Sequence, residues 1–287
     1  MKERTITLSS GLRTDNMSNC AIKNFSLQHT LESGQFFLYE KVDDWYYIIT
    51  TKKVFKVKQN KHRLYYDNIS RKELFRFLGL SVPYDEILGE IGKDKAIKKY
   101  MLQFHGLRVM QYDPWICTIS FLCSSASNIP KIRRTLFSFA RRFGKKVVYG
   151  SKAFFLFPSH GELGTEKELR ACGAGFRAKA IAQINAHPLS FFHALASLPY
   201  PAAKQILTNQ YGIGEKIADC ILLFAYNRWQ AFPIDVWIER ALLHHYNVKD
   251  NFSDFVPKQF PQYAGYAQQF LYHGFRLTQQ KSSRNLL

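Results

Sequence analysis

The stretch PAAKQILTNQYGIGEKIADCILLFAY, residues 201–226, decides the fold of this chain. Apolar residues recur with helical spacing on both sides of a short turn, which predicts one helix over 201–208 and a second over 215–226. The turn contains Gly212 and Gly214, and such a pair permits a tight bend that exposes backbone N–H groups at the start of the second helix. Amides in that arrangement can bind a phosphate without reading sequence. Helical hairpins also use glycine simply for turning, so the bend alone does not assign a function.

Two charged residues in and after this hairpin stand out. Lys216 lies in the first turn of the second predicted helix, where the helix dipole disfavours a charged amine. If the site is also partly desolvated, a neutral and nucleophilic amine becomes accessible; the alternative is an ordinary surface lysine. Asp235, in the run FPIDV of residues 232–236, precedes another helical pattern. Its default role is that of an N-cap, which is worth roughly 1 kcal/mol.

The rest of the chain divides into a β-rich part and a helical part. Segments 45–50, 54–58 and 63–67 are short and rich in aromatic and β-branched residues, which predicts an antiparallel meander with earlier strands between about 20 and 39. From Ser70 onward, N-cap residues and helical spacing predict helices, with Asp113 and Thr165 as further caps. These helices cover about 71–80, 114–124, 177–185, 189–198, 236–245 and 263–279, with a short one after Thr165. The predicted class is α+β, an antiparallel β-sheet domain packed on a mostly helical body.

The boundary between the two parts is expected near residue 105. Residues 1–105 would form the β-rich N-terminal domain with its following helices, and residues 106–287 the helical region, with a cleft between its helical subdomains.

The charge balance favours a polyanionic partner. The 287 residues include 40 Lys and Arg against 22 Asp and Glu, which gives a net charge of +18. Such an excess favours nucleic acid above all, because neutralising phosphates releases condensed counterions. A merely basic protein is the plain alternative, and a membrane surface is a weaker one because no basic amphipathic segment stands beside an anchor. Residues 131–146 carry seven basic side chains and no acid, which predicts either a solvated helix face or a face turned toward DNA.

Cysteine usage and the N-terminus indicate an intracellular protein. The five cysteines are scattered, odd in number and without a CxxC pair, so neither a disulfide framework nor a zinc or iron–sulfur site is indicated. We therefore expect no metal and no cofactor. The first residues lack the apolar core of a signal peptide, and no run of 18 apolar residues exists, so we expect no membrane partner.

The run GIGEKIADC of residues 212–220, followed by FPIDV, resembles the helix-hairpin-helix (HhH-GPD) DNA glycosylase superfamily. Within it the chain looks like an 8-oxoguanine DNA glycosylase with coupled AP lyase activity. The resemblance extends to residues 27–36, 121–129, 172–179 and 263–268, in the family's order, and thus to nearly the whole chain. It implies that the helical body is the glycosylase unit and that the partner is double-stranded DNA containing oxidised guanine. A glycosylase of the same fold for another damaged base, and a non-catalytic DNA-binding module, are the alternatives.

The resemblance also implies roles for residues of the reaction centre. Lys216 would attack the anomeric carbon of the sugar and form a Schiff base, and Asp235 would stabilise the developing sugar cation. The Gly34 carbonyl would accept the N7–H that distinguishes 8-oxoguanine from guanine. Three further residues would contact the extruded base: Gln268 at its Watson–Crick edge, Tyr272 as a stacking platform and Cys220 on the other side of the ring.

A second set of residues is implied to contact the DNA around the vacated position. It comprises Arg177 as reader of the orphan cytosine, Phe176 as a wedge, Lys131, Ser127 and Asn128, and the hairpin glycines Gly212 and Gly214. Six positions depart from the family pattern: Ala126 replaces an asparagine, Lys131 an arginine, Trp237 a histidine, Tyr211 a proline, Tyr272 a phenylalanine and Phe176 a tyrosine. Because lysine cannot form a bidentate fork, the preference for cytosine opposite the lesion is left open. We expect a monomer that acts in the cytoplasm or nucleoid of a prokaryote, or in the nucleus of a eukaryote.

Overall fold

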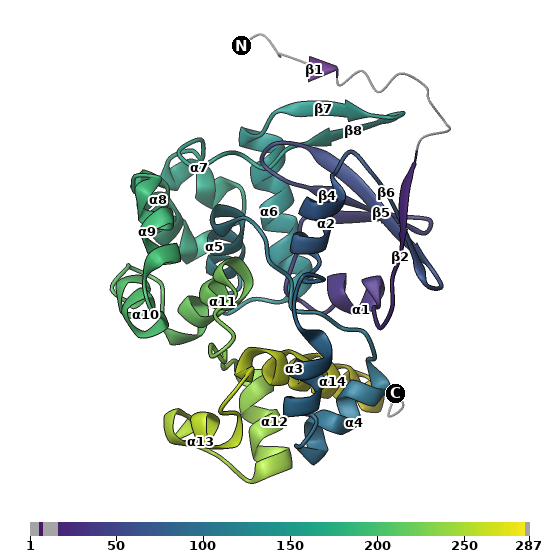
Figure 1. The fold of residues 1–287 in the computed structure, drawn as a ribbon. Helices are drawn as coiled ribbons and strands as arrows, with labels where there is room; N and C mark the ends of the chain where they lie inside the picture. Colours follow the sequence, from purple (N-terminus) through teal and green to yellow (C-terminus); the bar gives the residue numbers. More distant parts are fainter. Residues whose placement is uncertain (1–5, 8–16, 285–287) are drawn as a thin grey trace.

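The computed structural model describes residues 6–7 and 17–284, with side chains described for 17–280. Figure 1 shows three groups of elements: a sheet lobe, a group of helices running from α5 to α11, and a lower group that contains α3, α4 and α12–α14. Within the described residues, every helix is too short or too polar to cross a bilayer. The predicted α+β class is confirmed.

The sheet lobe is built on the predicted meander. Its strands follow the order β2-β6-β5-β4-β3 and pair antiparallel throughout. The strands are β2 (Ser18–Ala21), β3 (Tyr39–Val42), β4 (Trp45–Ile49), β5 (Val54–Asn60) and β6 (Arg63–Asp67). Along β4 the buried Tyr46 and Ile48 alternate with half-buried Trp45 and Tyr47, as expected for a strand with one face on the core, and Ile49 at the end of the strand is buried as well.

The prediction of strands across residues 20–39 is wrong for the middle of that segment. A short helix, α1 (Leu27–Leu31), lies there, and only β2 and β3 at the ends of the segment are strands. The Ser26 side chain accepts a hydrogen bond from the His29 amide and so caps the helix. Leu27 and Leu31 are buried on the core side. The helix is too short for its spacing to be told from that of a strand.

A second, smaller sheet lies in the region that was expected to be helical. It has the order β1-β7-β8, with β1 (Ile6–Thr7), β7 (Lys146–Tyr149) and β8 (Lys152–Phe155). The preceding helix, α6 (Ile129–Phe143), ends at Gly144. Lys145 and Lys146 therefore lie outside the basic helix to which the charge pattern assigned them.

The sequence did not predict helices at residues 84–91 and 95–103, where the structure has α3 and α4, but the remaining helices before α12 follow the prediction to within a few residues. They are α2 (Arg71–Phe77), α5 (Pro114–Leu122), α7 (Glu166–Ala171), α8 (Ala178–Ala186), α9 (Ser190–Ser197), α10 (Tyr200–Thr208) and α11 (Glu215–Tyr226), with a 3-10 turn η1 (Gly175–Arg177). Ser70 and Thr165 each form a complete capping box, and the Asp113 side chain caps α5. Local signals of this kind fix helix starts because they satisfy amides that the helix leaves unpaired.

The lower group joins two distant parts of the sequence. Helices α3 (Tyr84–Ile91) and α4 (Lys95–Gln103) pack against α14 (Ala264–Arg284), and α12 (Val236–Tyr246) packs on α14 as well. Helix α13 (Phe252–Gln259) follows α12 in this group (Figure 1). The expected boundary near residue 105 thus separates α3 and α4 from the helices they pack against.

His273 of α14 makes the acid stability of this packing testable. The ring is buried against His29 and Phe104, and burial lowers the pKa of His273 to about 3, with the cations Arg276 and His29 as further causes. The unfolded chain takes up a proton near pH 6.5, and the folded chain does not. This contribution to stability is therefore full above pH 6.5 and is lost as the pH falls toward 3.

We predict that His273→Phe flattens this dependence. In the parent, His273 alone steepens the fall of unfolding free energy by up to about 1.4 kcal/mol per pH unit between these limits. Urea unfolding at about pH 7.5 and about pH 5 measures it. His62→Phe, at an exposed histidine, is the control. Equal slopes in parent and His273→Phe would contradict the burial of a neutral ring.

Candidate active site

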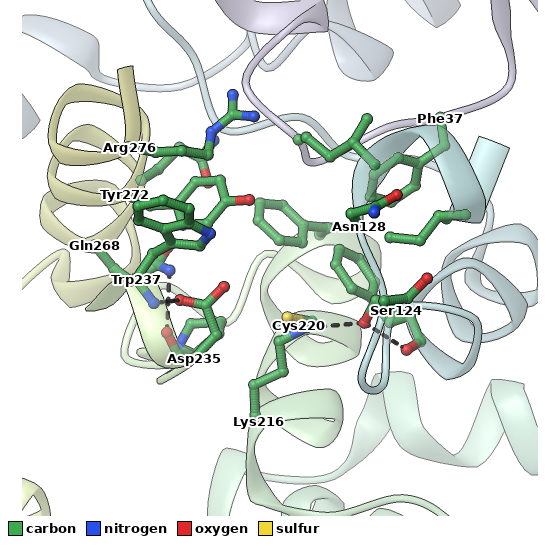
Figure 2. A pocket seen from close by; sticks show the side chains of 18 of the residues that line it. Phe37, Ser124, Asn128, Lys216, Cys220, Asp235, Trp237, Gln268, Tyr272 and Arg276 are labelled. Carbon is green, nitrogen blue, oxygen red and sulfur yellow. Dashed lines mark hydrogen bonds between the residues drawn. The ribbon is translucent and has the colours of Figure 1, made fainter. Parts of the chain in front are cut away.

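A cavity of about 220 Å³ lies where the three groups of elements meet. It is lined by the chain that follows α1, by the end of α5 and the start of α6, and by residues of α11, α12 and α14. Figure 2 shows the side chains around it. The predicted site residues in its wall are Gly34, Ser127, Asn128, Lys216, Cys220, Asp235, Gln268 and Tyr272.

The Lys216 amine is held against the end of α5. Its Nζ donates a hydrogen bond of 2.9 Å to Ser124 Oγ and lies 5.3 Å from the centre of the Phe121 ring. The Ser124 hydroxyl donates in turn to the Phe121 carbonyl at 2.7 Å, so its lone pairs are free to accept from the lysine. Ser124 and Phe121 both lie in the segment 121–129, to which the family resemblance extends. The sequence nevertheless did not predict the hydrogen bond between Lys216 and Ser124, which joins residues 92 positions apart.

Asp235 caps α12 and reaches the same cavity. One carboxylate oxygen, Oδ1, accepts from the amides of Trp237 and Ile238, each at 3.0 Å. The predicted N-cap is thus confirmed. Figure 2 shows the carboxylate directed into the cavity, with Lys216 reaching up from α11. Because helix amides fix one oxygen, a negative charge is held in a set position beside the lysine-bearing wall.

Gly34 and Gln268 contribute a close-packed backbone and a buried amide to the cavity wall. Gly34 has a φ of +81°, and a Cβ built on it would lie 3.1 Å from Tyr272 Cε1 and 3.3 Å from Ile129 Cδ1, so its backbone lines the wall without room for a side chain. Gln268 donates to the Pro233 carbonyl at 3.0 Å, while its buried Oε1 has no partner within the described residues. An unpaired buried acceptor is costly, and such groups often await a ligand.

Burial keeps two other groups of the wall neutral. It raises the pKa of the Cys220 thiol to about 12 and that of the Tyr272 hydroxyl to about 12. Both side chains therefore present uncharged surfaces, which suit contact with a base ring.

Five predicted site residues lie outside the cavity wall: Phe176, Arg177, Lys131, Gly212 and Gly214. Arg177 is only 6% exposed, and its guanidinium donates to the backbone carbonyls of Ser125, Ala126 and Ala174. Phe176 is 61% exposed, and the Arg177 guanidinium lies 4.5 Å from the centre of its ring. Ala126 has a φ of +45°, a conformation that asparagine tolerates better than alanine.

Close packing at Gly212 and hydrogen bonds of the buried Asp219 hold the hairpin and its two helices, α10 and α11, together. Gly212 has a φ of +80°, and a Cβ there would lie 2.6 Å from the Ala180 side chain. Buried Asp219 accepts from the Tyr200 hydroxyl at 2.6 Å and from Lys204 Nζ at 3.1 Å, which ties α11 to α10. Burial raises the pKa of Asp219, and the two hydrogen bonds oppose that rise. Sequence reasoning missed this pair of helix-to-helix contacts.

The chain is similar to known DNA glycosylases in sequence. The family described as the N-terminal domain of 8-oxoguanine DNA glycosylase matches residues 17–117. A probable N-glycosylase/DNA lyase of Methanothermobacter thermautotrophicus is 28% identical over 214 residues, 64% of this chain and 68% of that protein. The N-glycosylase/DNA lyase of Saccharomyces cerevisiae is 29% identical over 63% of this chain and 53% of its own length, so the chain spans about half of that relative.

A solved structure matches almost end to end. The 8-oxoguanine glycosylase/lyase of Clostridium acetobutylicum, in complex with double-stranded DNA containing cytosine opposite 8-oxoG, superimposes with a TM-score of 0.85 at 28% identity. The match covers 92% of this chain and 99% of that one. The fold and these comparisons make the chain similar to DNA glycosylases. Among these, the resemblance is to the 8-oxoguanine DNA glycosylase/lyases.

We predict that the helix clamp depends on Asp219 far more than on its exposed neighbour. Asp219→Ala leaves Lys204 and Tyr200 without their buried partner and should lower the free energy of unfolding by about 3 kcal/mol. Glu215→Ala removes a carboxylate whose side chain is 77% exposed and which also pairs with Lys204, and should cost under about 1 kcal/mol. Urea unfolding compares the two variants. A similar loss in both would show that the buried pair has no special weight.

Proposed function

We propose that this protein removes 8-oxoguanine from duplex DNA and then cuts the strand, with Lys216 as nucleophile and Asp235 as the stabilising carboxylate. One observation carries the proposal: an amine and a fixed carboxylate line the same cavity as a backbone and an amide suited to reading a base. The partner is duplex DNA with oxidised guanine, and one cavity engages one duplex, in keeping with a monomer. Such an enzyme works where the DNA is, in the cytoplasm or nucleoid of a prokaryote or the nucleus of a eukaryote.

The chemistry uses the two charged groups in sequence. The base must first leave the helix, because its glycosidic carbon is unreachable inside the stack. The neutral Lys216 amine attacks C1′, the C1′–N9 bond breaks, and the base departs with a proton. Opening of the sugar ring gives a Schiff base, which allows loss of a C2′ proton and expulsion of the 3′ phosphate. Asp235 stabilises the positive charge that develops on the sugar during the first step.

Recognition of the lesion rests on one hydrogen. The N7 of 8-oxoguanine carries a proton, whereas the N7 of guanine is an acceptor. The Gly34 carbonyl is proposed to accept that proton, and Gln268, whose Oε1 is unpaired, to meet the Watson–Crick edge of the base. Tyr272 and Cys220 supply the two faces. A guanine in this position would bring its N7, an acceptor, next to the Gly34 carbonyl oxygen, which is also an acceptor, and this arrangement is energetically unfavourable.

Contacts with the duplex are proposed for residues outside the cavity. The exposed Phe176 suits insertion into the gap left by the base, and Ser127 and Asn128 lie at the cavity edge. Exposed Lys131 and the hairpin glycines Gly212 and Gly214 suit phosphate contact. Arg177 reads the orphan base only after its guanidinium leaves the Ser125 and Ala126 carbonyls.

We predict that Lys216→Gln abolishes covalent capture of substrate. Borohydride reduction of the parent with an 8-oxoguanine duplex should trap an enzyme–DNA adduct, and the variant should form none while its affinity for the duplex changes by less than about threefold. Lys179→Gln, at an exposed lysine beside the hairpin, should trap normally. A parent that binds DNA but yields neither adduct nor free base would leave only a DNA-binding module. Release of other damaged bases with indifference to 8-oxoguanine would instead assign a different lesion.

We predict that Asp235→Asn separates the charge of this residue from its capping role. Asparagine caps helices as well as aspartate, so stability should change by under about 1 kcal/mol. Base excision in single-turnover assays should slow by about 100-fold, because the sugar cation loses its counter-charge. Asp113→Asn, at the cap of α5, is the matched control and should excise at the parent rate. Parent-like excision by Asp235→Asn would remove the electrostatic role.

A further inference from the structure

The position of the Gly34 carbonyl sets how well the protein separates 8-oxoguanine from guanine, if the proposed function holds. In the described part of the chain, no hydrogen bond is made to that carbonyl oxygen. A glycine with a free carbonyl and a positive φ has little to hold it in place by itself. A recognition group must nevertheless be fixed to within about 0.5 Å to discriminate. Neighbouring residues must therefore supply the rigidity.

The next residue, Gln35, is completely buried and fully hydrogen-bonded. Its Nε2 donates to the carbonyls of Thr30 and Arg108, at 3.0 and 2.7 Å, and lies 2.9 Å from Ser33 Oγ. Its Oε1 accepts from the Met110 amide at 2.8 Å. The side chain thus joins the loop after α1 to the extended segment 107–112, which runs between α4 and α5.

The backbone is tied on both sides of Gly34 as well. The Tyr112 hydroxyl donates to the Gln35 carbonyl at 2.8 Å, and Gln269 Nε2 donates to the Ser33 carbonyl at 3.1 Å. The carbonyls before and after that of Gly34 are therefore both occupied, whereas that of Gly34, a residue of the cavity wall, accepts no hydrogen bond within the described residues. Of these ties, the Gln35 side chain makes the most, with hydrogen-bonding partners in Thr30, Ser33, Arg108 and Met110.

We propose that Gln35 is a positioning residue for lesion specificity: its buried amide holds the Gly34–Gln35 peptide so that the Gly34 carbonyl meets the N7–H of 8-oxoguanine. Gln35 touches neither the sugar nor the attacking amine. Its loss should therefore weaken recognition of the base much more than cleavage at a sugar that has already lost its base. This inference rests on the proposed function.

The test compares two substrates in the full-length protein. Gln35→Leu removes all of the side-chain hydrogen bonds at nearly constant volume. Gln59→Leu is the matched control, because Gln59 also ties backbone within the sheet lobe, at Phe25, Leu27 and Lys61, away from Gly34. Single-turnover rates are measured for base release from an 8-oxoguanine duplex and for strand cleavage at a preformed abasic site. Release of normal guanine gives the discrimination ratio.

We expect Gln35→Leu to lower the ratio of base release to abasic-site cleavage by about tenfold, and Gln59→Leu to leave it at the parent value. Discrimination against guanine should fall with it. Equal loss of both activities, or a ratio within about twofold of the control, overturns the inference. If Gln35→Leu does not fold, Tyr112→Phe, which removes only the hydroxyl that holds the Gln35 carbonyl, is measured with the same criteria and a smaller expected drop of about threefold. A parent without abasic-site cleavage would overturn the proposed function itself.

Discussion

The structure depends on the segment 227–235, which leads from α11 to α12 and so fixes where Asp235 stands relative to Lys216. Arg228 anchors its start, because the guanidinium donates to the carbonyls of Ala196 and Leu198 at the end of α9, each at 2.8 Å. Helix α14 anchors the rest: the Gly265 amide donates to the Trp229 carbonyl at 2.8 Å, and Gln268 donates to the Pro233 carbonyl. Hydrogen bonds from this segment to the end of α9 and to α14 thus position the Asp235 carboxylate, and Lys216 does not.

Helix α14 contacts both the loop that carries Gly34 and the segment that carries Asp235. Gln268 holds the segment before Asp235, and Gln269, the next residue, holds the Ser33 carbonyl before Gly34. Tyr272, one turn further, lies against the space where a Gly34 side chain would be. Helix α14 therefore fixes the position of the sheet lobe relative to the segment that carries the Asp235 carboxylate. Because α3 and α4 pack on the same helix, this lower group combines two segments that lie far apart in the sequence.

Helix starts, which depend on a few neighbouring residues, could be predicted from the sequence. Contacts between residues that are distant in the sequence could not. The caps at Ser70, Asp113, Thr165 and Asp235 follow from one side chain and its next three residues, and the structure has all of them. The helix α1 and the hairpin β7–β8 were missed because each is too short to show a period.

For the site, the resemblance selected eight residues that line the cavity and five that lie outside its wall. It did not reveal the contact of Lys216 with Ser124, the clamp at Asp219 or the bonds of Gln35. These contacts join residues far apart in sequence. Buried polar side chains find their hydrogen-bond partners only when the chain has folded, and no pattern of residue spacing in the sequence predicts which partners these are.

The proposed reaction requires the Lys216 amine to form the covalent bond to the sugar. The most direct measurement reduces the reacting parent protein with borohydride on an 8-oxoguanine duplex, digests it, and locates the sugar remnant by peptide mass spectrometry. The account predicts that the remnant is carried by the peptide containing Lys216 and by no other. A remnant on another lysine or on the N-terminal amine would contradict it.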